Sequence, residues 1–149
     1  MPRSRWGAIL CGGLIAGTVD VGAAAIISAR SPVRILHFIA GGLLGPAALR
    51  PGVGIALLGL TLQWLMSILI ATPYVMAVAR SRALARRPIS GGVLYGTVIF
   101  FVMNYIVVPS SAWHVTAHFS RFTFAANLVA MWVFGCIVGL FALGVAVRS

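Results

Sequence analysis

Four long apolar stretches dominate the pattern of hydrophobic and polar positions along the chain. An α-helix rises about 1.5 Å per residue and the hydrocarbon core of a bilayer is about 30 Å thick, so each stretch is long enough to cross a membrane. Their apolar residues surround each predicted helix instead of forming one stripe, as expected in lipid. We predict four transmembrane helices, over residues 7–29, 52–79, 91–108 and 122–147. The second requires tilt or a kink at Pro73, and the third stops at Pro109.

The segment between the first two stretches, residues 31–46, has a different pattern. Ser31 and Pro32 are typical of a helix N-cap and first helical position. The next twelve residues are apolar except for Arg34 and His37, whose spacing of three places them on one face. Several glycines and Pro46 interrupt the end of the segment. It predicts a short interfacial or re-entrant helix, and a fifth transmembrane helix is the alternative.

The composition excludes several classes of protein. Hydrophobic residues make up 61% of the 149 residues and charged residues only 8%, whereas a soluble domain has roughly a quarter charged residues. A soluble enzyme, a disordered tail and a disulfide scaffold are all excluded. We predict a single all-α membrane domain over residues 1–149, a bundle of the four transmembrane helices plus the short helix. Cys11 and Cys136 lie within apolar runs and are expected to be packing residues.

The charge distribution indicates an orientation in the membrane. All eleven basic residues are arginines at the ends of apolar runs, which is typical of membrane topology and anionic-lipid contact and not of nucleic-acid binding. In a four-helix topology, seven fall on one side and four on the other. The first set is Arg3, Arg5, Arg80, Arg82, Arg86, Arg87 and Arg148, and the second is Arg30, Arg34, Arg50 and Arg121. We predict a multi-pass protein of the bacterial inner membrane with both termini in the cytoplasm.

Asp20 is the only acidic residue of the chain and lies inside the first predicted span. A carboxylate inside a membrane is energetically costly, so its presence suggests a function by default. It could act as a proton relay, as an ion site or as the partner of a cation, for which Arg34 is best placed. The equal alternative is a hydrogen bond to Thr18, Gln63, Asn104 or Asn127 that fixes helix register. In both cases we expect Asp20 to face the interior of the bundle. Because this carboxylate interrupts the first apolar run, we expect that run to be a retained helix and not a cleaved signal peptide.

Three histidines form a weaker constellation. His114 and His118, four residues apart after Pro109, predict one face of a short outer helix, and the topology places His37 on the same side. Three imidazoles are ligands for zinc, copper or a tetrapyrrole, but packing at the interface beside Trp113 is the favoured interpretation. We predict no cofactor. The chain also lacks a nucleophile–base pair and a phosphate-binding loop, so we predict that it is not an enzyme.

Glycines at four-residue spacing recur in three of the predicted spans. Such pairs allow close approach of helix backbones in lipid, where the hydrophobic effect contributes little to helix association. The pairs therefore favour a tight bundle. They are Gly13 and Gly17, Gly92 and Gly96, and Gly135 and Gly139.

Short motifs extend over most of the chain. They are the run AGTVD ending at Asp20, the run IAGGLLG ending at Gly45, and the run MNYIVVP ending at Pro109. In these motifs the chain resembles a family of small, uncharacterised bacterial inner-membrane proteins with the patterns AGTxD, IAxGLLG and MNxxVVP. The resemblance implies a four-helix membrane fold and no settled activity. Similar proteins carry histidines where this chain has Gln63 and Trp132, a departure that speaks against a metal or proton role shared with Asp20.

Two functional hypotheses follow. The first is a non-enzymatic structural or accessory subunit that packs in the lipid bilayer against other membrane proteins or against copies of itself. The second is a small transporter or channel that uses Asp20. A wet cavity reaching Asp20 would favour the second, and a packed carboxyl group would favour the first.

Overall fold

In the computed structural model, which describes residues 4–115 and 118–146, the chain is mostly helical and no strand occurs among these residues. This confirms the all-α prediction. The two N-terminal α-helices are α1 (Arg5–Ser28) and α2 (Pro32–Leu44), which a 3₁₀ turn, η1 (Gly45–Leu49), extends. The helices that follow are α3 (Val53–Arg80), α4 (Arg82–Arg86), α5 (Pro88–Val102), the π segment η2 (Met103–Val107), α6 (Val108–Ser110) and α7 (Arg121–Ala146).

Local sequence explains where the first two helices begin and end. Ser4 caps α1 by accepting a hydrogen bond from the Gly7 amide at 3.0 Å. At the other end Ala29 takes the left-handed conformation, with φ of 51°, and so reverses the chain toward α2. Ser31 and Pro32 occupy the N-cap and the first position of α2, as their residue types predict.

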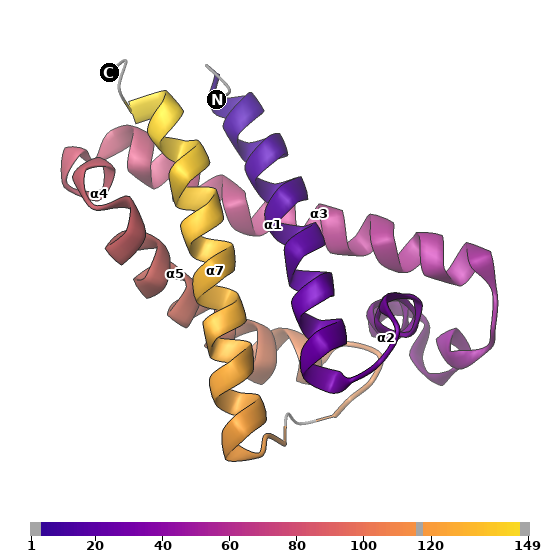
Figure 1. The fold of residues 1–149 in the computed structure, drawn as a ribbon. Coiled ribbons are helices and arrows are strands. Elements are labelled where there is room, and N and C mark those ends of the chain that lie inside the picture. Colours follow the sequence, from indigo (N-terminus) through magenta and orange to yellow (C-terminus); the bar gives the residue numbers. More distant parts are fainter. Residues whose placement is uncertain (1–3, 116–117, 147–149) are drawn as a thin grey trace.

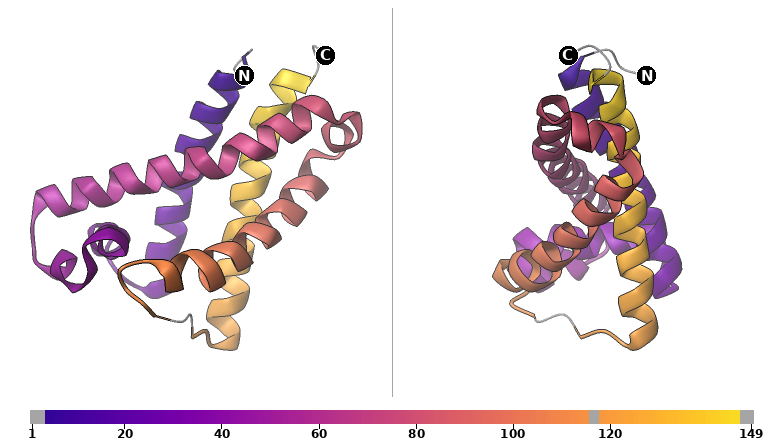
Figure 2. Two further views of the ribbon diagram at one scale, coloured as in Figure 1. Left: turned by 180° about the vertical axis from the view of Figure 1, so that it is seen from behind. Right: turned by 90° about the vertical axis from the view of Figure 1, so that its left-hand side faces the viewer.

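The arrangement is dominated by α1 and α7, which lie side by side and run in opposite directions (Figure 1). The α3 helix crosses both obliquely, and α5 packs along α7 (Figures 1 and 2). The two termini lie at one end of the molecule near α4, and the α1–α2 connection and the start of α7 lie at the opposite end. Figure 1 shows α2 almost end-on while α1 and α7 run along the plane of the view, so α2 lies across them.

Glycines bring α5 and α7 into backbone contact. A Cβ atom placed on Gly92 would lie 2.7 Å from the Gly135 carbonyl oxygen, and one on Gly139 would lie 2.8 Å from the Pro88 carbonyl oxygen. A Cβ atom on Gly96 would overlap the Met131 carbonyl group. The glycines that the sequence offered for helix contacts are thus used between helices of this one chain.

The core lies where α1, α3 and α7 meet. Its buried residues include Ala16, Ala71, Val75 and Val138. Tyr95 of α5 stacks on Tyr74 of α3, with ring centroids 4.6 Å apart. Small residues such as Ala16 and Ala71 and larger ones such as Val75 and Val138 therefore fill the space between the helices together.

Within residues 4–115 and 118–146, five helices are long and apolar enough to cross a membrane. The fifth, beyond the four predicted spans, is the continuous helix Pro32–Leu49 formed by α2 and η1. The helix predicted to stop at Pro109 instead continues to Ser110 as part of Pro88–Ser110. It accommodates the proline through the π segment, where the Val108 amide bonds to the Met103 carbonyl group five residues earlier.

Candidate functional site

The candidate site lies where α1 crosses α3, and small residues make the crossing close. A Cβ atom on Gly13 would lie 3.0 Å from Cα of Ile68, and one on Gly17 would overlap the Ser67 hydroxyl group. Ser67 itself is 2% exposed. The glycines of α1 thus bring its backbone against α3, and the polar side chains that follow along α1 come within hydrogen-bonding distance of α3.

Asp20 is bound by an amide at this crossing. Its Oδ2 atom accepts a hydrogen bond from Gln63 Nε2 at 3.0 Å, and the same nitrogen donates to the Gly17 carbonyl oxygen at 3.2 Å. Because both partners are acceptors, they fix the orientation of the amide, with its nitrogen toward α1. Gln63 therefore holds the carboxyl group and the helix backbone at the same time.

A second hydrogen bond lies beside the first. Trp64 Nε1 donates to Thr18 Oγ1 at 3.2 Å, and the Thr18 hydroxyl group donates to the Leu14 carbonyl oxygen at 2.8 Å. Two consecutive residues of α3 thus bind two residues of α1 that are two positions apart. This pair of contacts fixes the register between the helices.

The other partners that the sequence offered to Asp20 are used elsewhere. Asn104 Nδ2 donates to the Phe100 carbonyl oxygen at 2.9 Å, and Asn127 Nδ2 donates to that of Thr123 at 2.7 Å, each within its own helix. Arg34 lies exposed in the first turn of α2. Among residues 4–115 and 118–146, the structure brings the amide of Gln63 to Asp20 and no cation.

The histidines are not gathered into one site. His37 Nε2 lies 3.1 Å from the Gly52 carbonyl oxygen, whereas His114 and His118 lie in the connection between α6 and α7. The prediction that these two share a face of a short helix is wrong, because residues 111–115 and 118–120 are not helical. Within the described part of the chain, no group of three or more histidine, cysteine, aspartate or glutamate side chains is placed to hold a metal ion.

Contacts with α2 explain why the helix ends before His114. The Ala112 amide donates to the Gly42 carbonyl oxygen at 2.9 Å. Trp113 stacks on Phe38 with ring centroids 5.0 Å apart, and its Nε1 donates to the Phe38 carbonyl oxygen at 2.9 Å. These bonds hold residues 112 and 113 against α2, so the backbone cannot continue the helical path.

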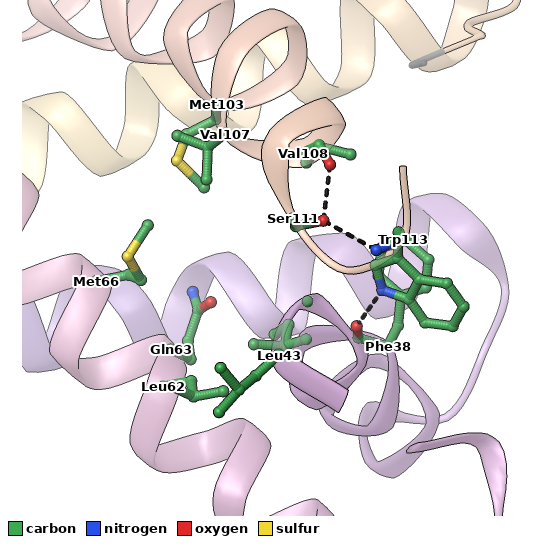
Figure 3. Close-up of a pocket in the computed structure, with 12 residues that line it drawn as sticks. Phe38, Leu43, Leu62, Gln63, Met66, Met103, Val107, Val108, Ser111 and Trp113 are labelled. Atoms are coloured by element: carbon green, nitrogen blue, oxygen red, sulfur yellow. Dashed lines mark hydrogen bonds between the residues drawn. The ribbon is translucent and has the colours of Figure 1, made fainter. Parts of the chain in front are cut away.

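A cavity of about 290 Å³ lies beside the α1–α3 crossing. Figure 3 shows side chains from α2, α3 and the π segment pointing into it. Its walls are almost wholly apolar, and Gln63 connects them to Asp20. The residues lining it are Phe38, Ile39, Gly42, Leu43, Leu62, Gln63, Met66, Met103, Val107, Val108, Ser111 and Trp113.

Sequence reasoning missed the contacts that hold α2 in place. A Cβ atom on Gly41 would overlap the Trp113 ring, and one on Gly59 would overlap the Leu36 carbonyl group. The signal was available in the Gly41–Gly42 doublet, which leaves one face of an otherwise bulky helix without side chains. Nothing in the sequence indicated which aromatic residue covers that face.

Comparison of the chain with models of known families, with curated proteins and with solved structures gives no match.

Proposed function

We propose that the chain is a multi-pass protein of the bacterial inner membrane in which α1, α3, α5 with its extension to Ser110, and α7 cross the bilayer. The α2 helix lies at the outer interface in this proposal. Its orientation across α1 and α7 (Figure 1) and its exposed Arg34 support an interfacial position. The arginines of α4 lie at the end of the molecule that also holds the termini, which supports a cytoplasmic location for that end.

Within that membrane we propose a non-enzymatic role, as a structural or accessory subunit. The observation that supports it is the pairing of Asp20 with Gln63 beside the pairing of Thr18 with Trp64. Polar groups inside a membrane mark either chemistry or helix association. Here both pairs join α1 to α3 at a close backbone crossing, which is the geometry of association.

The partner in this proposal is another membrane protein or a second copy of the chain. The paired glycines are used within the chain, so the contact must involve outward surfaces. The outward face of α1 is one such surface, where Ile15, Val19 and Ile26 are exposed and nothing lies within 4 Å of a Cβ atom placed on Gly22. A neighbouring helix can approach closely at that glycine.

Native purification in a mild detergent tests the accessory role. We expect the chain in a complex larger than the monomer, and we expect Gly22→Leu to dissociate it. Gly54→Leu is the matched control. A Cβ atom on Gly54 also meets nothing within 4 Å, but Gly54 lies on α3 and not on the outward face of α1. A chain that purifies as a lone monomer would contradict the proposal.

The second candidate is a small transporter or channel that uses Asp20. Only Oδ2 of this carboxyl group has a hydrogen-bond partner among the described residues. Since no enclosed side-chain oxygen or nitrogen lacks a partner in the same part of the chain, Oδ1 is not fully enclosed. An intramembrane carboxyl group with one oxygen left unpaired is the feature that favours transport.

Proton flux into vesicles containing the purified protein tests this candidate. Asp20→Asn keeps an acceptor for Gln63, but the asparagine amide cannot gain or lose a proton near neutral pH. Transport through Asp20 predicts a flux in the unmodified protein that Asp20→Asn abolishes. A flux equal to that of protein-free vesicles would exclude proton transport and leave the accessory role.

A further inference from the structure

The cavity beside Gln63 has an opening toward the surroundings of the protein. Leu43, on its wall, is 63% exposed, and Phe38 is 43% exposed. Both belong to α2, so the outer wall of the cavity is formed by one short helix. With α2 at the outer interface, as proposed above, a molecule in the outer leaflet can reach the cavity past these side chains.

The polar atoms on the wall are already bonded, with one exception. Ser111 Oγ donates to the Val108 carbonyl oxygen at 2.7 Å and accepts from the Trp113 amide at 3.4 Å. The indole nitrogen of Trp113 donates to the Phe38 carbonyl oxygen. These bonds are drawn in Figure 3. They leave neither side chain with a free donor to offer to a ligand.

The exception is the carbonyl oxygen of the Gln63 side chain. Its nitrogen is bonded to Asp20 and Gly17, and this fixes Oε1 on the other arm of the planar amide group, pointing away from α1. In Figure 3 that oxygen lies on the side of Leu43, within the space that the lining residues surround. Among the described residues no hydrogen bond to Oε1 occurs, and because no enclosed side-chain oxygen or nitrogen there lacks a partner, Oε1 is accessible to a ligand. An unpaired acceptor in an apolar environment costs free energy.

We propose that this cavity binds one membrane-soluble molecule that has an apolar body and a hydroxyl group, with the hydroxyl group donating to Gln63 Oε1. The apolar body contacts the methionines and aliphatic residues, chiefly Leu62, Met66, Met103 and Val107. Methionine side chains adapt to ligands of different shape. The volume of about 290 Å³ is just below the range for small-molecule sites, which begins near 300 Å³, so the ligand must be small.

The acceptor makes the site selective by chemical class. A hydroxyl group satisfies Oε1, whereas an ether or a ketone of the same shape brings a second acceptor and leaves both unpaired. This binding is independent of the accessory role and of transport through Asp20, because it uses the oxygen of Gln63 and not its nitrogen.

Photolabelling in phosphatidylcholine vesicles tests the proposal. The probes are an aliphatic alcohol with a diazirine on its chain and the methyl ether of the same compound, with labelled peptides identified by mass spectrometry. We expect the alcohol to label residues 62–66 and 103–113 about fivefold more than the ether, the ratio that corresponds to one hydrogen bond of about 1 kcal/mol. Equal labelling of the unmodified protein by the two probes would overturn the proposal without any variant.

Two variants locate the site. Gly42→Leu fills the cavity, where a Cβ atom has only Ser111 Cβ nearby at 3.9 Å, and we expect it to abolish labelling by both probes. Gln63→Leu should remove the preference for the alcohol. Asn127→Leu is the matched control, since this amide bonds within α7 and lies off the cavity wall. The Asn127→Leu protein should retain the preference for the alcohol. Labelling that Gly42→Leu leaves unchanged would also overturn the proposal.

Discussion

Gln63 and Asp20 contribute unequally to stability, because replacing Gln63 leaves a polar group without a partner and replacing Asp20 does not. Gln63→Leu removes the donor and leaves the carboxyl group of Asp20 without a partner, which should cost about 1–3 kcal/mol. Asp20→Leu leaves Gln63 Nε2 still bonded to the Gly17 carbonyl oxygen and should cost about 1 kcal/mol or less. Loss of helical circular dichroism during titration of the detergent-solubilised protein with denaturing detergent measures both.

The double variant Asp20→Leu with Gln63→Leu provides the decisive comparison. Replacing both partners by apolar residues removes the unpaired group together with the bond, so the double variant should be more stable than Gln63→Leu alone. A double variant whose loss equals the sum of the two single losses would show that the pair does not interact.

The partner of Asp20 shows what a sequence can and cannot predict about a single residue. The cost of a carboxylate in lipid predicts a polar partner, and Gln63 was among those proposed. Choosing between Gln63, Asn104 and Arg34 requires knowing which helix crosses α1 at Asp20. That choice depends on the contact of Gly13 and Gly17 with α3, more than forty residues away in the sequence.

Between elements, the contact of α5 with α7 is the most sensitive to added volume. Gly92→Ala would place a Cβ atom 2.7 Å from the Gly135 carbonyl oxygen and 2.8 Å from the Cys136 amide nitrogen. Backbone atoms cannot move aside as a flexible side chain can, so the helices must separate. We expect a loss of about 1–3 kcal/mol, measured in the same denaturing titration.

Gly22→Ala is the matched control for this variant. A Cβ atom on Gly22 meets nothing within 4 Å, and alanine favours helix by up to about 1 kcal/mol relative to glycine. The control should therefore be neutral or stabilising for the monomer. Equal destabilisation by both changes would contradict the α5–α7 contact as the cause, because a Cβ atom on Gly22 meets no neighbour.

At the level of elements, the sequence predicts helices well and connections poorly. The long helices follow from apolar length, and α2 begins where Ser31 and Pro32 indicate. The segment after Ser110 was predicted to be helical from the spacing of His114 and His118, and it is not. Its path is determined by Trp113, which donates a hydrogen bond to a residue of α2 that is 75 positions away in the sequence. A local sequence pattern cannot predict such a contact.

For the whole molecule, the proposed orientation predicts the sides from which two positions can be labelled. In a chain with Cys11 and Cys136 changed to alanine, Arg86→Cys should react with a membrane-impermeant maleimide only after the cytoplasmic side is exposed. His114→Cys should react in intact spheroplasts, because the α6–α7 connection lies at the opposite end from α4. Labelling of position 86 from the outside would reverse the topology.

The packing of α7 has a consequence for biogenesis. This helix contacts α1, α3 and α5, yet it follows all of them in the order of synthesis. Until it enters the bilayer, the Gly92 face of α5 has no neighbour, and Gly12 of α1 lacks the Phe141 side chain that lies over it. The bundle therefore closes only when translation of α7 is complete, and every shorter nascent chain presents open helix faces to insertases and membrane proteases.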